Sequence, residues 1–172
     1  MRIAVTGTPG TGKTTATAEL ADRFDGYDVV HLNEVIERQS LYTDVDEERD
    51  SVVADLDALA SHLRGRQDVV FESHLAHHLP ADRVAVLRCE PTVLDRRLTA
   101  RGETDAKARE NAESEALDVI LAEAVDVHGI ESVYEIDTTD RAPDAVASAL
   151  GEVVRGDREP SAGEVDFVGY LA

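Results

Sequence analysis

The sequence contains little positive charge, few aromatic residues and a single cysteine. Of its 172 residues, 17 are Lys or Arg and 36 are Asp or Glu, which gives a formal net charge of −19 at pH 7. Lys13 and Lys107 are the only lysines. Such a surface repels phosphates, so we do not expect nonspecific binding to nucleic acid. The acidic side chains also repel one another and destabilise the folded state unless salt screens their charge. This composition therefore indicates a halophilic protein of a very salty cytosol.

Long apolar runs and cysteine pairs are absent as well. No run approaches the roughly 20 apolar residues that a membrane span needs, and the N-terminus lacks a signal-peptide pattern. Cys89 has no second cysteine to pair with, which excludes an internal disulfide and fits a reducing compartment. We therefore expect a soluble, cytoplasmic protein of one domain that has no membrane partner.

Short apolar runs alternate with helical patterns along most of the chain. Strands are expected at residues 2–6, 27–32, 68–72, 83–89 and 132–137. Helices are expected at residues 13–24, 45–65, 91–100, 104–127 and 143–155. One more helix is expected after the second strand, with Asn33 as its N-cap. The helix at 45–65 rests on the spacing of Val52, Val53, Leu56, Leu59 and Leu63. The alternation predicts an α/β fold, a doubly wound five-stranded parallel sheet with helices on both faces.

The turn after the first expected strand carries the strongest motif. Residues 7–14 read GTPGTGKT, which fits the Walker A pattern of P-loop proteins. Gly10 and Gly12 let the backbone wrap around an anion, and the following helix offers its positive end. Lys13 is expected to reach the β- and γ-phosphates, Thr14 to place its hydroxyl on Mg²⁺, and Thr15 to add one contact. The loop therefore predicts a site for ATP and Mg²⁺.

Other P-loop classes fit the chain less well than a small kinase does. A GTPase needs an Asn/Thr-Lys-x-Asp motif, and neither lysine stands in one. The chain is too short for a transporter ATPase and lacks the acidic pair of many motor ATPases. Phosphoryl transfer by a kinase needs arginines that close over the site. Five arginines cluster in the sequence and form the expected lid: Arg88, Arg96, Arg97, Arg101 and Arg109.

Acidic and histidine residues follow the third expected strand. Glu72 ends that strand, where a carboxylate can hold Mg²⁺ directly or through water. His74 is expected to face the site, whereas His77 and His78 are interpreted as solvated residues of a surface loop. A metal site at the three histidines is not expected, because Pro80 shortens any helix and no cysteine lies near.

The chain ends in a segment of different composition. Residues 1–155 form the expected P-loop kinase domain, and residues 156–172 combine a linker-like stretch, GDREPSAGE, with an apolar ending, VDFVGYLA. We interpret this ending as a tail that folds back onto its own domain. A partner-binding tail is the alternative.

Several motifs resemble the adenylate kinase isoenzyme 6 family, the small nucleoside monophosphate kinases of archaea and eukaryotic nuclei. They cover most of the chain to about residue 127, in the family's order: TGTPGTGKTT, LNEVIERQSLYTDVDEERDSVVADLDAL, VVFESHLAHHLP, VLRCEPTVLDRRLTARG and AKARENAESEALDVILAEA. YEIDTT resembles the family's last strand and the turn near the adenine. The family usually has Asp-x-His where this chain has Glu72-Ser73-His74.

The resemblance implies positions for the ligands. ATP contacts are implied for Gly10, Gly12, Lys13, Thr14 and Thr15. A monophosphate-binding segment is implied at about residues 31–54, and a lid at about residues 100–110. Within the lid the resemblance implies that Arg101 contacts ATP, and Arg97 and Arg109 are candidates for a similar role.

The resemblance also implies an activity and partners. The activity is that of a broad-specificity adenylate kinase, which transfers phosphate from ATP to AMP or related monophosphates and also has ATPase activity, to which the histidine of the 72–74 segment contributes. The family is linked to maturation of the small ribosomal subunit, through transient binding of the eleventh small-subunit ribosomal protein and cleavage of the rRNA precursor.

Together these features predict a magnesium-dependent nucleoside monophosphate kinase. The expected catalytic residues are Lys13, Arg101 and His74, and the expected metal ligands are Thr14 and Glu72. Two alternatives stay open: an ATP-switched ribosome assembly factor whose main activity is ATP hydrolysis, and a kinase for another small metabolite.

Overall fold

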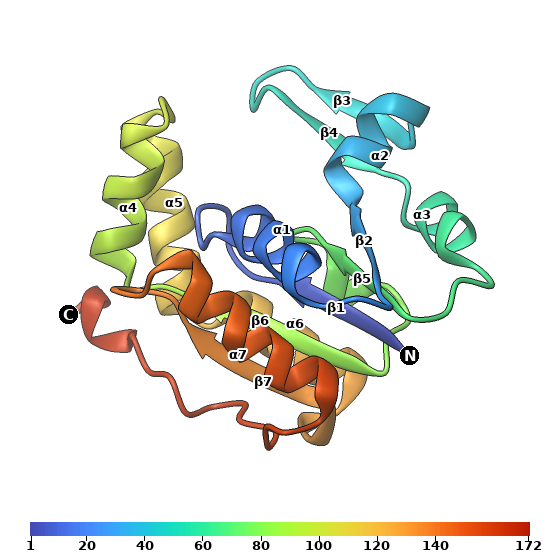
Figure 1. The fold of residues 1–172 in the computed structure, drawn as a ribbon. Coiled ribbons are helices and arrows are strands. Elements are labelled where there is room, and N and C mark those ends of the chain that lie inside the picture. Colours follow the sequence, from blue (N-terminus) through green and yellow to red (C-terminus); the bar gives the residue numbers. More distant parts are fainter.

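The computed structural model describes residues 1–172, and a five-stranded sheet forms its centre (Figure 1). All strand pairs in this sheet are parallel, in the order β2-β5-β1-β6-β7. The strands are β1 (Arg2–Thr6), β2 (Asp28–His31), β5 (Val69–Glu72), β6 (Arg83–Arg88) and β7 (Val133–Asp137). The predicted five-stranded parallel sheet is confirmed. Since β1 lies between β5 and β6, the turn after β1 opens at the switch point where α/β sheets bind ligands.

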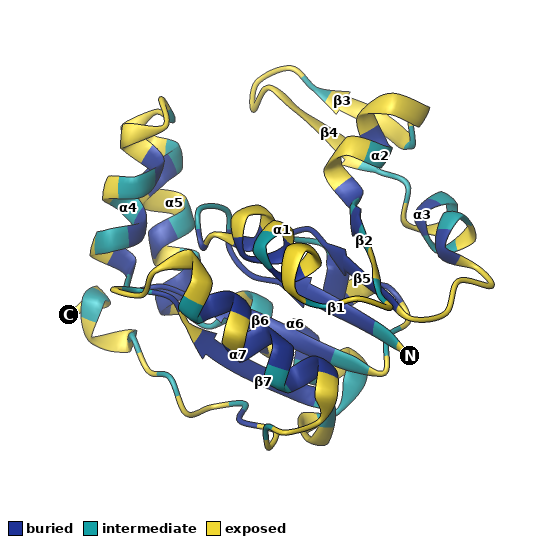
Figure 2. Cartoon of the chain, in the orientation of Figure 1, coloured by how far each residue is buried: buried dark blue, intermediate teal, exposed yellow.

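Helices cover both faces of the sheet (Figures 1 and 2). One face packs against α1 (Lys13–Arg23) and α7 (Pro143–Arg155), through a core that includes Val5, Leu20 and Leu150. The other face packs against α2 (Leu32–Gln39), α3 (Leu56–Leu63) and α6 (Val119–His128), around a core that includes Phe71. Side chains alternate along each strand, so the apolar runs of the strands supply both cores.

Two further helices form a separate pair above the carboxyl edge of the sheet. They are α4 (Pro91–Ala100) and α5 (Asp105–Ala116), and they pack together through Leu94, Leu98 and Ala108. Glu90 caps α4, and the Thr104 hydroxyl caps α5 by accepting from the Lys107 N–H. The predicted lid, at about residues 100–110, covers the turn between these helices and the first half of α5.

The helix predicted over residues 45–65 is wrong in its first half. Residues 42–54 form an antiparallel hairpin of β3 (Tyr42–Asp46) and β4 (Ser51–Ala54), and α3 begins only at Leu56. Val52 and Val53 are exposed on this hairpin, so their helical spacing reflects no buried face. Their β-branched side chains favour a strand. Asp55 then caps α3 by accepting a hydrogen bond from the Ala58 N–H at 3.0 Å.

Two other predicted helix boundaries also differ. Helix α2 begins at Leu32 rather than after an Asn33 cap, because the Asn33 side chain accepts a hydrogen bond from the Ser73 hydroxyl at 3.1 Å. The predicted helix over 104–127 is interrupted between α5 and α6, where Asp118 has a left-handed φ of 55°. The Asp118 carboxylate is bonded to the buried Arg88, which holds the interruption in place.

The last residues lie against their own domain. The Ser161 N–H donates to the Val133 carbonyl at 3.0 Å, and the Glu164 N–H donates to the Glu135 carboxylate at 2.8 Å. The Phe167 ring then lies 5.5 Å from the Arg88 guanidinium. The short 3-10 helix η3 (Val168–Leu171) ends the chain near α5. No helix in the fold is both long enough and apolar enough to cross a membrane.

Candidate active site

The turn between β1 and α1 forms a cradle at the carboxyl edge of the sheet. Gly10 and Gly12 have φ of 91° and 88°, a conformation that other residues rarely adopt. A Cβ on Gly10 would also lie 2.9 Å from the side chains of Leu94 and Leu98. Helix α1 starts at Lys13 with no side-chain cap. Its first backbone N–H groups are therefore available to an anion.

Lys13 lies over this cradle. Its Nζ donates to the carbonyl oxygens of Gly7 at 2.8 Å and Thr8 at 3.1 Å. Burial lowers the pKa of Lys13 to about 8, although the carboxylates of Glu72 and Glu115 act in the opposite direction. A bound phosphate would add negative charge next to this buried ammonium and would favour its charged form.

Thr14 and Glu72 lie side by side next to the cradle. The Thr14 hydroxyl donates to Glu72 Oε1 at 3.0 Å, and His31 Nδ1 lies 2.8 Å from the same oxygen. The Glu72 side chain is buried. A hydroxyl and a carboxylate are hard oxygen donors of the kind that Mg²⁺ prefers, so the pair fits this ion.

His31 is a functional candidate that the sequence reasoning missed. It ends β2 and lies opposite Glu72 in the parallel register of β2 and β5. The signal was available in principle, because polar residues that end adjacent parallel strands meet at one edge. To use this signal, one would have to know that β2 pairs with β5 and not with β1, the strand that precedes it in the sequence.

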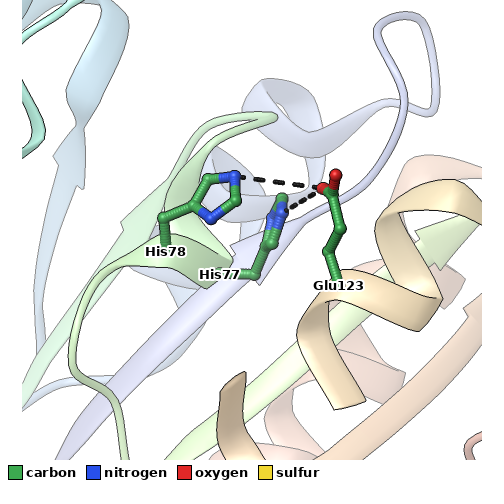
Figure 3. Close-up of side chains that lie close together, drawn as sticks. All are labelled: His77, His78 and Glu123. Carbon is green, nitrogen blue, oxygen red and sulfur yellow. Dashed lines mark hydrogen bonds and ion pairs between the residues drawn. The ribbon is translucent and has the colours of Figure 1, made fainter. Parts of the chain in front are cut away.

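The three histidines after β5 have different surroundings. His74 is half-buried, and burial together with nearby Lys13 lowers its pKa to about 4, so its ring is neutral at neutral pH. The interpretation of His77 as solvated is wrong. Its ring is buried, 2.8 Å from the Thr6 hydroxyl and 2.9 Å from the Glu123 carboxylate (Figure 3). His78 is exposed, as expected.

The predicted lid arginines separate into two groups. Arg97 donates to the carbonyl oxygens of Thr138 at 3.0 Å and Thr139 at 2.8 Å, so it ties α4 to the turn after β7. Arg101 is exposed at the end of α4, and its charge contributes to lowering the pKa of Lys13. Arg109 is exposed on α5, where it shares a surface groove with Arg96.

Arg88 is not a lid residue, which corrects the sequence prediction. It ends β6 inside the protein, where its guanidinium contacts the carboxylates of Glu115, Asp118 and Glu135. The other oxygen of Glu115 accepts a hydrogen bond from the Thr8 hydroxyl at 2.6 Å. This buried network therefore connects the end of α5 with the phosphate-binding turn.

Comparisons with known proteins identify the family of the chain. The chain matches the family model described as AAA domain over residues 3–118. A protein from Natronomonas pharaonis named "Putative adenylate kinase" is 60% identical over 171 residues, which cover 99% of this chain and 100% of the relative. Proteins of the same name are 57% identical in Halobacterium salinarum, over 99% of this chain and 100% of theirs, and 42% identical in Methanosarcina acetivorans, over 90% and 86%.

Solved structures share the fold at low sequence identity. Shikimate kinase from Bacteroides thetaiotaomicron superposes with a TM-score of 0.63 at 18% identity, over 90% of this chain and 98% of that one. A sugar kinase from Janibacter gives a TM-score of 0.55 at 17% identity, over 90% and 94%. The chain therefore belongs to the archaeal adenylate kinase family that its motifs resemble, and its fold is the P-loop fold of the nucleoside monophosphate kinases.

Proposed function

We propose that this protein is a magnesium-dependent nucleoside monophosphate kinase that transfers the terminal phosphate of ATP to AMP or a related monophosphate. One observation carries the proposal: the uncapped start of α1 and the buried Lys13 ammonium face the same turn, beside the Thr14 and Glu72 pair. The names of the relatives support an adenylate kinase, and the P-loop fold supports ATP as the donor.

In this proposal the turn binds the donor. The N–H groups around Gly10 and Gly12 and those of Lys13, Thr14 and Thr15 surround the phosphates, and the Lys13 ammonium moves from the loop carbonyls to the β- and γ-phosphate oxygens. Thr14 and Glu72 would hold Mg²⁺, which supplies positive charge to the same oxygens when bound.

His31 keeps the Glu72 carboxylate in position through its hydrogen bond at 2.8 Å. The longer side chain of glutamate thereby stays next to Thr14 instead of rotating away. A fixed carboxylate orients what it binds better than a mobile one, so we assign His31 a positioning role.

In this proposal, an arginine of the α4–α5 pair offsets the negative charge that develops on the transferring phosphoryl group. We assign this role to Arg101, whose guanidinium is exposed and whose charge acts on Lys13. Arg109 is a second exposed candidate. Arg97 has a different role in the proposal, because its donors are engaged by the carbonyls of Thr138 and Thr139. It holds the turn that the resemblance places near the adenine.

The acceptor is proposed to bind between residues 31–54 and the phosphate-binding turn. Figure 1 shows the β3–β4 hairpin and the α4–α5 pair rising from the same side of the sheet. Arg49 at the hairpin turn lies 3.5 Å from the Glu110 carboxylate on α5. The two segments therefore approach each other over the site, as closure around two nucleotides and exclusion of water require.

An ATP-switched ribosome assembly factor is the second candidate. It is favoured by His74, whose neutral ring near Lys13 can accept a hydrogen bond from a water molecule. Water held in this way would lead to ATP hydrolysis instead of transfer to a monophosphate. The acidic surface also suits a basic partner, such as the eleventh small-subunit ribosomal protein.

Turnover with different acceptors separates these functions. ADP formation from ATP and Mg²⁺ would be measured in multimolar KCl, alone and with AMP, CMP, GMP or UMP, with Lys13→Ala as the control for contaminants. We expect strong stimulation by AMP and no turnover in the variant. ADP formation that is the same with and without each monophosphate, but faster with the ribosomal protein, would favour the assembly factor. No turnover with any of these partners would favour a kinase for another metabolite.

A further inference from the structure

Two histidines and one glutamate converge at a place that the proposed reaction does not use. His77 and His78 belong to the 3-10 helix η1 (Ala76–His78), and Glu123 belongs to α6. Both rings face the Glu123 carboxylate (Figure 3). His77 Nε2 lies 2.9 Å and His78 Nε2 lies 3.9 Å from the same carboxylate oxygen.

The spacing of these atoms suits one metal ion. A ligand atom from each residue lies within 4.8 Å of those from the other two. Bonds of about 2.0–2.1 Å at tetrahedral angles place two donor atoms roughly 3.3 Å apart. The observed separations of 2.9 Å and 3.9 Å lie on either side of this value. Small side-chain rotations would therefore bring all three atoms to coordination distance.

The surroundings hold one ligand rigidly and leave the others accessible. The His77 ring is fixed by Thr6 Oγ1, which lies 2.8 Å from its Nδ1, and the His77 carbonyl accepts from His128 Nε2 at 2.7 Å. Outer partners of this kind orient histidine ligands in metal sites. The side chains of His78 and Glu123 are 31% and 46% exposed, so an ion can enter from solvent.

We propose that His77, His78 and Glu123 bind a divalent transition metal ion of the zinc class, with a fourth position open to water. Two imidazole nitrogens and one carboxylate favour Zn²⁺, Co²⁺ or Ni²⁺ over Mg²⁺, which prefers oxygen ligands alone. This site is separate from the Thr14 and Glu72 pair, and the proposal does not depend on the kinase function.

The ion would act on the base of the phosphate-binding turn. It would join η1 to α6, and its ligand His77 contacts Thr6, the last residue of β1 before the turn begins. With metal on Nε2, the His77 ring carries its proton on Nδ1 and donates it to Thr6 Oγ1. Binding to the folded protein alone also raises the melting temperature by mass action.

Cobalt titration of the full chain tests the site without nucleotide or Mg²⁺. Four-coordinate Co²⁺ absorbs strongly in the visible region, and Zn²⁺ should displace it. We expect one Co²⁺ per chain, and at least a tenfold loss of affinity in His78→Ala and in Glu123→Gln. His62→Ala in α3 is the matched control, and Glu72→Gln tests the proposed magnesium pair. Both controls should bind Co²⁺ as the unchanged protein does.

The result that overturns the proposal is equally specific. No saturable Co²⁺ binding would mean that the His77 ring is simply held by Thr6 and Glu123. Binding that is lost in Glu72→Gln and kept in His78→Ala would place the ion at the phosphate site. As a second readout, Zn²⁺ should raise the melting temperature of the unchanged protein but not of His78→Ala. An inactive kinase would change none of these results.

Discussion

Removal of Arg88 should destabilise the protein far more than removal of a surface arginine. Its side chain is 1% exposed and faces Glu115 and Glu135, whose side chains are 4% and 1% exposed. Arg88→Met keeps much of the apolar stem but leaves two buried carboxylates without their cation. Breaking a buried pair in this way costs about 3–5 kcal/mol. For a chain of this size the loss corresponds to a melting temperature lower by roughly 6–20 °C.

Urea unfolding followed by far-ultraviolet circular dichroism measures the effect, since the protein has no tryptophan. The matched control is Arg38→Met, because Arg38 and its partner Glu34 are 78% and 55% exposed, and we expect a loss below about 0.5 kcal/mol. A loss below about 1 kcal/mol in Arg88→Met at pH 8 would refute the reasoning.

Three further predictions concern the phosphate-binding turn and the lid. Gly10→Ala should weaken ATP binding and lower the free energy of unfolding by about 1–3 kcal/mol in melting experiments. The reason is that φ at Gly10 is 91° and that the new Cβ would lie 2.9 Å from side chains of α4. A variant with unchanged stability and ATP affinity would contradict this prediction. Because the pKa of Lys13 is about 8 without ligand and phosphate binds the charged form, affinity for ATP should fall roughly tenfold from pH 7 to pH 9; equal titrations at both values would argue against it. Arg101→Ala should lower kcat by about 100-fold or more with little change in the urea midpoint. Arg97→Ala should instead lower the free energy of unfolding by about 2 kcal/mol, because it removes the hydrogen bonds to Thr138 and Thr139. Similar effects of the two variants on kcat and on stability would contradict this assignment.

The parts of the fold that the sequence predicts are those with local signals. The phosphate-binding turn combines fixed glycines, Lys13 and Thr14 within eight residues, and its conformation depends on backbone freedom that the sequence reveals directly. Four of the five strands are mostly buried on both faces and appear as short, mainly apolar runs, whereas only Val30 is buried in the edge strand β2. Their alternation with helices leaves few topologies for a parallel sheet.

The wrong predictions share the opposite property, because they depend on contacts between distant residues or on exposed segments. Val52 and Val53 match a helical spacing, but on an exposed hairpin nothing selects between helix and strand by burial. The burial of Arg88 requires Glu135, which lies 47 residues later, and that of His77 involves Glu123, which lies 46 residues later. Without an arrangement in space, an arginine near other arginines is indistinguishable from a lid residue.

The most direct test of the kinase proposal is the stoichiometry of the products. The protein would be incubated with ATP, AMP and Mg²⁺ in multimolar KCl, and all three nucleotides and inorganic phosphate would be quantified by chromatography and ³¹P NMR. We predict that two molecules of ADP form for each AMP consumed, with no release of phosphate, and that Lys13→Ala abolishes the reaction. Accumulation of ADP and phosphate in equal amounts, with AMP unchanged, would contradict the proposal and identify the protein as an ATPase.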